Sequence, residues 1–336
     1  MSEGFEHDLI RSGAALVAHA DRGLVRITGT ERATWLQGLL TNDVEALAPG
    51  RGCYAAWLTA QGRMITDAVV LAEDDALTLE VAATLGETVH RQLEQAIFAE
   101  DVHLVNETGR WRTLGVHGAT AAQVVARAAG GSHPAPLLLT TETLDAWGEY
   151  DHAPLGVLGR IARTSLYGVP GFLLRVLAAD ADLWMSRLRL GGATFTAAAA
   201  VEFARIEAGR PEFLTDMDAD TIPLEAGIEH RAISFTKGCY VGQEVIVRVV
   251  HRGGGRVARK LVGLTLDCDT PPPARAAVKS ERGEIGRVTS AAWSPRLQTI
   301  VALAYVHRDF VAPGTAVHVT CDGADVTATV HGFPMP

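Results

Sequence analysis

The octapeptide KGCYVGQE at residues 237–244 is the most distinctive stretch of this 336-residue chain. Its two glycines, Gly238 and Gly242, indicate a tight turn or a close approach of the backbone to a ligand, because glycine lacks a Cβ atom. Lys237 stands two residues before Cys239, and an ammonium group lowers the pKa of a thiol when the two side chains converge. The octapeptide is therefore predicted to be a functional segment, with Cys239 and Lys237 as its candidate chemical groups.

The segment that follows the octapeptide is basic. Residues 248–260 contain five Lys or Arg side chains and one His, but no Asp or Glu. Guanidinium groups bind carboxylates and phosphates well, so Arg248 and Arg252 are candidates for holding an anionic group. Two solvated charges at the end of a strand are an equally good interpretation of these arginines.

Upstream of the octapeptide, residues 197–208 are predicted to form a helix that carries Glu207 in its last turn. Gly209 suits the C-terminal end of a helix, and the following Pro211 prevents its continuation. From its position alone, Glu207 is a helix-terminal Glu on a solvated face. Residues 233–236, with the sequence ISFT, predict a strand that leads into the octapeptide.

Helix and strand patterns are mixed through most of the chain. A helix over 30–39 precedes several strands with hairpin-like turns, and this mixture favours an α+β fold over a doubly wound parallel sheet. We expect one module at residues 1–255, composed of two α+β subdomains with residues 53–107 nested in the remainder. Residues 256–336 contain only short β-branched strands separated by Gly, Pro or Asp-Gly turns, which predicts a small antiparallel β-barrel domain.

The net charge of the chain is −9, from 30 Lys and Arg against 39 Asp and Glu. A net acidic protein repels nucleic acid, so direct nucleic-acid binding is not expected outside the local basic segment. The N-terminus has no basic region followed by an apolar run, and no stretch approaches the ~18 apolar residues that span a bilayer. The four cysteines are scattered, which speaks against a disulfide framework or a structural zinc site. These features predict a cytoplasmic protein without membrane contact.

Several runs of the sequence resemble the YgfZ-type folate-binding proteins of the glycine-cleavage T-protein superfamily. These runs are PLEAG at 223–227, AISFTKGCYVGQE at 232–244, R-x-x-x-R-G at 248–253, LQG-x-x-TNDV at 36–44, GR-x-x-x-D at 62–67 and GRVTS at 286–290. The likeness spans almost the whole chain. It implies a flat ring of three subdomains around tetrahydrofolate, with an α+β fold and a small antiparallel C-terminal barrel.

The resemblance also implies roles for single residues. Glu207 matches the position at which T-proteins hold the pterin, and a carboxylate is the natural bidentate partner of the donor edge of a pterin. Arg248 and Arg252 would then suit the glutamate tail of the folate. Tyr240 and Asn42 lie inside the matching runs and are further candidates for folate contact.

One position departs from the T-protein pattern. T-proteins carry an Asp-Asp pair for aminomethyl transfer, whereas this chain has Thr66 followed by Asp67. The transfer needs a positioned acid or base, so the loss of one carboxylate favours folate binding without transfer. An aminomethyltransferase that relies on Asp67 alone is the alternative function.

Cys239 has three interpretations. It is an inert small packing residue, a thiolate that forms a transient mixed disulfide, or a ligand of an iron–sulfur intermediate shared with a partner. The role of the resembling family in iron–sulfur maturation favours the second and third of these. We therefore expect a folate-binding accessory protein rather than a conventional enzyme, with reduced folate and iron–sulfur client or assembly proteins as partners and an indirect role in tRNA modification. A tRNA-binding module that uses the basic segment is a weaker hypothesis, because the whole chain is acidic.

Overall fold

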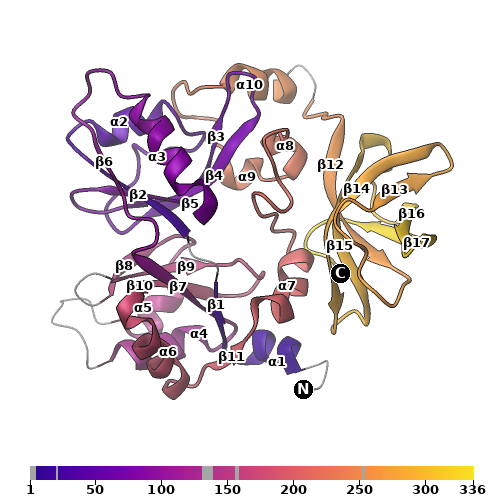
Figure 1. Ribbon diagram of the computed structural model, residues 1–336, viewed down its shortest axis with the longest axis horizontal. Helices are drawn as coiled ribbons and strands as arrows, with labels where there is room; N and C mark the ends of the chain where they lie inside the picture. The colour runs from indigo at the N-terminus through magenta and orange to yellow at the C-terminus, as the bar shows by residue number, and fades with distance from the viewer. Residues whose placement is uncertain (1–4, 20–21, 131–138, 156–158, 252–253) are drawn as a thin grey trace.

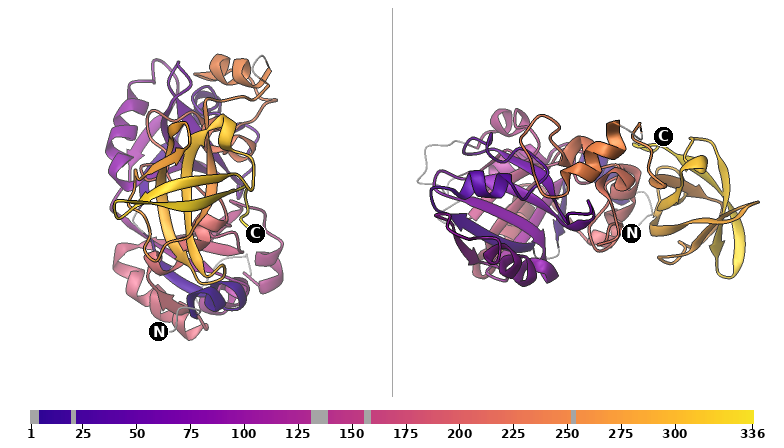
Figure 2. Two further views of the ribbon diagram at one scale, coloured as in Figure 1. Left: turned by 90° about the vertical axis from the view of Figure 1, so that its right-hand side faces the viewer. Right: turned by 90° about the horizontal axis from the view of Figure 1, so that it is seen from above.

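The computed structural model describes the chain except for residues 1–4, 20–21, 131–138, 156–158 and 252–253. Three bodies surround a central group of short helices (Figure 1). Two of the bodies are α+β units, and the third is a β-barrel that projects to one side of them (Figure 2). The helices of the central group, together with the N-terminal helix beside them, are α1 (Phe5–Ser12), α7 (Glu202–Glu207), α8 (Pro223–Ala226) and α9 (Glu229–Ala232).

The first body is a five-stranded antiparallel sheet with the strand order β3-β4-β5-β2-β6. Two helices cover one face of this sheet, where Trp35, Leu36, Val89 and Leu93 pack against Val70 and its neighbours. Their spacing puts the apolar side chains of each helix on the side that faces the sheet. The elements are β2 (Arg22–Thr28), α2 (Arg32–Gln37), β3 (Gly52–Leu58), β4 (Met64–Ala72), β5 (Leu77–Ala82), η1 (Ala83–Leu85), α3 (Gly86–Glu94) and β6 (His103–Asn106).

The second body is a six-stranded sheet with the order β11-β1-β7-β10-β9-β8, antiparallel except for the β1–β11 pair. Strands β1 and β7 are neighbours in this sheet although the whole first body lies between them in the chain. The first body is therefore an insertion into the second. The elements are β1 (Ala15–Ala18), β7 (Trp111–His117), α4 (Ala121–Ala129), α5 (Thr141–Asp145), β8 (His152–Leu155), β9 (Gly159–Thr164), β10 (Gly171–Leu177), η2 (Ala178–Asp180), α6 (Ala181–Leu190), β11 (Thr194–Thr196) and η3 (Ala198–Val201).

The third body is a closed antiparallel barrel with the strand order β12-β15-β14-β13-β16-β17. Pairing of β17 with β12 closes it, and closure removes the unpaired edges that an open sheet of such short strands exposes. The α+β fold with an antiparallel C-terminal barrel is therefore confirmed. The elements are β12 (Arg259–Leu266), β13 (Ala277–Ser280), β14 (Gly283–Ser294), β15 (Thr299–His307), η4 (Arg308–Phe310), β16 (Ala316–Cys321) and β17 (Ala324–His331).

A buried charged network joins α7 to the barrel. Arg205 donates to Asp216 at 2.6 Å and to Ser290 Oγ of β14 at 2.9 Å. Asp216 also accepts hydrogen bonds from the hydroxyls of Thr289 and Ser290. The network holds the barrel against the helix that carries Glu207.

Two local expectations around the octapeptide are wrong. Residues 233–236 form no strand, since 233–234 are irregular and 235–236 belong to a bend. Arg248, for which a strand-end position was one of two interpretations, lies instead in helix α10 (Gln243–His251) together with the apolar run before it. Ile246 is buried, and Val249 and Val250 pack against the same core, so the contacts follow the i, i+3, i+4 spacing of a helix.

Candidate active site

Asp67 lies on the face of β4 that points toward the central core of the molecule. It stands opposite Ala56 of β3, which belongs to that core, and Tyr54 Oη donates a 2.8 Å hydrogen bond to Asp67 Oδ2. Burial raises the pKa of the Asp67 carboxyl, and the opposing effects of nearby Arg22 and of the Tyr54 hydrogen bond do not cancel it. A buried, oriented carboxyl with a raised pKa is suited to accept or donate a proton.

Thr66 faces the opposite side of the same sheet. It pairs with Trp57, which packs in the core between the sheet and its two helices, and the Thr66 hydroxyl donates to the carbonyl of Asp67 at 2.8 Å. Side chains alternate along a strand, so a carboxylate at position 66 would point into this apolar core and away from the Asp67 side chain. The replacement of the first acid of the pair by Thr66 therefore removes no carboxylate from the immediate surroundings of Asp67. This replacement does not argue against aminomethyl transfer.

Arg231 of α9 completes the surroundings of Tyr54. Its guanidinium group lies 5.0 Å from the centre of the Tyr54 ring and donates to Tyr150 Oη at 2.6 Å and to Glu149 Oε1 at 3.1 Å. Asn42 Nδ2 donates to the carbonyls of Tyr54 and Arg231 at 2.8 and 3.0 Å. The amide donors of Asn42 are thus used to join β3 to α9, which is a positioning role for this predicted folate contact.

A cavity of about 710 Å³ opens beside Arg231. Arg210, Arg231 and Lys260 bring cationic groups to its wall, Glu149 and Glu229 bring carboxylates, and Phe333 brings an aromatic ring. Arg210 also donates to Ser165 Oγ at 2.8 Å. A cavity of this size with a few charged groups suits an anionic organic molecule.

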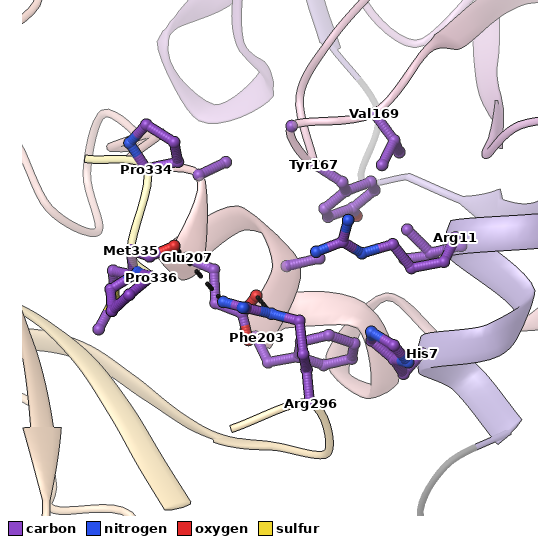
Figure 3. Close-up of a pocket in the computed structure, with 14 residues that line it drawn as sticks. His7, Arg11, Tyr167, Val169, Phe203, Glu207, Arg296, Pro334, Met335 and Pro336 are labelled. Atoms are coloured by element: carbon purple, nitrogen blue, oxygen red, sulfur yellow. Dashed lines mark hydrogen bonds and ion pairs between the residues drawn. The ribbon is translucent and has the colours of Figure 1, made fainter. Parts of the chain in front are cut away.

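Glu207 lines a second cavity of about 370 Å³ on the other side of Ala208, a residue that contributes to both cavities. Figure 3 shows the carboxylate facing Arg296 from the barrel, with Tyr167 and Arg11 across the cavity. Arg296 Nε donates to Glu207 Oε2 at 2.9 Å, and Ser294 Oγ donates to Oε1. An ionised carboxylate accepts up to about four hydrogen bonds, so Glu207 retains acceptor capacity for a ligand.

The Lys237 ammonium group bonds backbone carbonyls of a neighbouring segment. Its Nζ donates to the carbonyls of Gln37, Leu40 and Asn42 at 2.6, 2.6 and 3.0 Å, which fixes the octapeptide to the segment after α2. Burial lowers the pKa of the Lys237 ammonium group to about 8. Cys239 lies exposed two residues further on, and its activation by Lys237 stays a prediction.

The remaining candidates of the octapeptide region have mixed positions. Tyr240 is a buried member of the central core. Gly242 has a positive φ of 84°, and a Cβ atom at this position would lie only 2.5 Å from the carbonyl oxygen of Thr59. That close approach explains the second glycine of the octapeptide. Arg248 is exposed on α10, whereas Arg252 lies outside the described residues.

The fold of the chain is that of the T-proteins. The crystal structure of the glycine cleavage system aminomethyltransferase T from Bartonella henselae superposes with a TM-score of 0.85, over 99% of this chain and 89% of that chain, at 22% identity. The three-subdomain T-protein-like architecture expected from the sequence is therefore confirmed.

The family follows from the sequence matches. Residues 3–237 match the GCVT N-terminal domain, and residues 259–335 match the glycine cleavage T-protein C-terminal barrel domain. The chain therefore belongs to the glycine cleavage T-protein family.

Curated relatives that carry the name aminomethyltransferase are similar to the chain over nearly its whole length. The protein from Cutibacterium acnes is 30% identical over 342 residues, and the one from Saccharopolyspora erythraea is 28% identical over 339 residues. Each match covers 98% of this chain and 89% of the relative. The superfamily part of the sequence resemblance is confirmed, and the YgfZ-type subgroup stays a prediction.

No helix within the described part of the chain is long and apolar enough to cross a membrane.

Sequence reasoning missed Tyr54, Arg231 and Tyr150 as partners of the Asp67 region. Tyr54 lies two residues before Ala56 on β3, so the two side chains share a face of the strand. Because Ala56 is opposite Asp67, the alternation of side chains along the predicted hairpin identifies Tyr54 as a neighbour of Asp67 on the same face. Arg231 and Tyr150 come from two distant segments. Only the packing of the central helices brings them together.

Proposed function

We propose that this protein binds tetrahydrofolate at the C-terminal end of α7 and catalyses aminomethyl transfer on it, with Asp67 as the acid or base. The observation that carries this proposal is the buried, Tyr54-oriented Asp67 carboxyl with its raised pKa. The name of the curated relatives supports the reaction class. The position of Thr66 on the opposite face of β4 removes the main objection to it.

The residues around α7 suit a reduced folate. Glu207 would hold the donor edge of the pteridine, because its carboxylate lines a cavity together with the aromatic rings of Tyr167 and Phe203. Arg210 and Lys260 on the neighbouring cavity would pair with the carboxylates of the glutamate tail. When bound, tetrahydrofolate supplies a nucleophilic nitrogen to the transferred carbon.

Asp67 handles the proton of the transfer. In the transfer, the bond between the carbon and its donor would break as the nitrogen–carbon bond forms, and Asp67 Oδ would accept the proton that the attacking nitrogen loses. Tyr54 keeps the carboxylate oriented through its 2.8 Å hydrogen bond. Arg231 helps to hold the Tyr54 ring, since its guanidinium group lies over the ring at 5.0 Å from the centre.

Binding of tetrahydrofolate is expected to depend on the Glu207 carboxylate. Glu207→Gln should raise the dissociation constant for tetrahydrofolate by about tenfold to a hundredfold, since a charge-assisted hydrogen bond contributes ~1.5–3 kcal/mol. Isothermal titration calorimetry with tetrahydrofolate measures this. Ser294→Ala is the matched control, because it removes a barrel contact of Glu207 and keeps the carboxylate. Equal affinities of wild type and Glu207→Gln, or no heat from the wild type, would exclude this role for Glu207.

A second candidate function is the YgfZ-type support of iron–sulfur enzymes. The observation that favours it is the exposure of Cys239 within a segment, residues 235–247, that also exposes the apolar side chains of Phe235, Val241 and Val247. An accessible thiol beside exposed apolar residues suits contact with a client protein. This function predicts a folate-dependent accessory role in place of turnover, with client or assembly proteins as partners.

The accessory function requires the thiol of Cys239. In a strain that lacks the native protein, Cys239→Ala should fail to restore the activity of iron–sulfur enzymes, whereas wild type and Cys268→Ser should restore it. Titration with tetrahydrofolate should be unchanged in Cys239→Ala, because the thiol is not part of either cavity wall. Full restoration by Cys239→Ala would reduce the cysteine to a packing residue.

A further inference from the structure

Two cysteines meet at one end of the barrel. Cys321 is the last residue of β16, and Cys268 lies two residues beyond the end of β12. Their Sγ atoms are 3.6 Å apart, although 53 positions separate them in the chain. Strands β12 and β16 are not hydrogen-bonded neighbours, because β17 lies between them. A bond between the two sulfurs would therefore connect parts of the barrel that no backbone ladder joins directly.

The segments that carry the two thiols are already held together. Thr270 Oγ1 donates to Asp322 Oδ2, next to Cys321, at 2.9 Å, and Asp267 N donates to the carbonyl of Thr327 in the intervening strand β17 at 3.1 Å. Cys268 Sγ also donates to the carbonyl of Thr270 at 3.2 Å. A disulfide has a sulfur–sulfur bond of about 2.05 Å, so the Sγ atoms need to approach by about 1.5 Å. Rotation of the side chains supplies movements of this size without a change of the strands.

The surroundings of the pair restrict its chemistry. Cys321 is buried in the barrel core, and Cys268 packs against the same core from its rim. The partly exposed Cys268 is the sulfur that an oxidant in solution reaches first. Once Cys268 is oxidised, Cys321 is the nearest thiol that resolves it.

We propose that Cys268 and Cys321 are an oxidisable dithiol that closes to a disulfide across the end of the barrel when the protein meets a peroxide. The Cys268 thiolate attacks one oxygen of hydrogen peroxide, the O–O bond breaks, and a sulfenic acid and the first water form. The Cys321 sulfur then attacks the sulfenic sulfur, the S–O bond breaks, and the second water leaves. The two thiols lose two electrons and two protons, and the peroxide is reduced to two molecules of water.

The rate of closure should depend strongly on pH. Burial and the neighbouring Cys321 raise the pKa of the Cys268 thiol to about 12, and the thiolate is the reactive form. The thiolate fraction therefore rises about tenfold per pH unit between pH 7 and pH 9. Disulfide closure should be slow at neutral pH, and its rate should rise about tenfold for each pH unit between pH 7 and pH 9.

The test uses the full chain with Cys239→Ser, which removes the exposed thiol that would form bonds between molecules. Three cysteines then remain, and hydrogen peroxide followed by denaturation should lower the titratable thiols from three to one. Trypsin leaves Cys268 in residues 261–275 and Cys321 in residues 309–336, so mass spectrometry without reductant should find these two peptides linked. Dithiothreitol should restore both thiols.

Closure should also stabilise the barrel end, because a cross-link over a long loop restricts the unfolded chain. The melting temperature of the oxidised protein should rise by about 5 °C over the reduced protein, and Cys268→Ser should abolish the rise. If peroxide yields only sulfinic or sulfonic acid at Cys268, or a linked pair that includes Cys53, the proposal is wrong. If linkage occurs at equal rates at pH 7 and pH 9, the proposed thiolate attack is wrong.

Discussion

Replacing Asp67 with Asn is expected to lower the kcat of aminomethyl transfer to tetrahydrofolate by about 10²- to 10⁴-fold, the usual contribution of a positioned acid or base. The Asn side chain keeps an oxygen that accepts the Tyr54 hydrogen bond, so the geometry of the site is retained while proton transfer is lost. Formation of methylene-tetrahydrofolate from an aminomethyl donor is the measurement. This expectation rests on the proposed transfer function.

The stability of Asp67→Asn shows whether a loss of turnover comes from lost proton transfer or from misfolding. The folded-state pKa of Asp67 lies above its unfolded value, so the ionised carboxylate is disfavoured in the folded protein. The resulting destabilisation is absent below the unfolded pKa and grows as pH rises through the window up to the folded pKa. Asp67→Asn removes it, so the variant should be at least as stable as wild type at neutral pH.

Thr66→Ser is the matched control for Asp67→Asn. It keeps the hydroxyl that bonds the carbonyl of Asp67 and changes only the opposite face of β4, so turnover should stay within about twofold of wild type. If wild type binds tetrahydrofolate without any turnover, the transferase function is excluded and the accessory function gains support. If both variants lose turnover equally, Asp67 is not the acid or base.

The second large effect is expected at Arg205. Arg205→Ala leaves Asp216 without its cationic partner, and the Arg205 and Asp216 side chains are 3% and 0% exposed. Breaking one side of a buried ion pair costs ~3–5 kcal/mol, because a buried charge is left without compensation. The free energy of unfolding should fall by this amount in urea denaturation.

The control for Arg205 is an ion pair at the surface. Arg308 contacts Asp309 at 3.9 Å with both side chains more than half exposed. Arg308→Ala should change the free energy of unfolding by less than about 0.5 kcal/mol, because solvent screens such pairs. Similar urea midpoints for Arg205→Ala and wild type would contradict a structural role for the Arg205–Asp216 network.

The barrel was predictable because its information is local. Short β-branched strands and their turns are adjacent in sequence, and the hairpin β16–β17 is formed by neighbouring residues. Helix α10 was not predictable in the same way. Its run of Val and Ile favours strands by propensity, and only the burial of Ile246, Val249 and Val250 against the central core selects the helix.

The octapeptide at residues 237–244, together with the other matching runs of the sequence, was enough to determine the superfamily of this protein. The sequence also placed Asp67 and Glu207 among the candidates, because Asp67 lies in a matching run and Glu207 matches the position at which the T-proteins hold the pterin. Tertiary structure alone decided what these side chains meet. Thr66 and Asp67 point to opposite faces since a strand alternates, and Lys237 is held by three carbonyls rather than by a thiol. Contacts such as Tyr54 with Arg231 or Cys268 with Cys321 join segments far apart in the chain, and only the packing of the whole molecule specifies them.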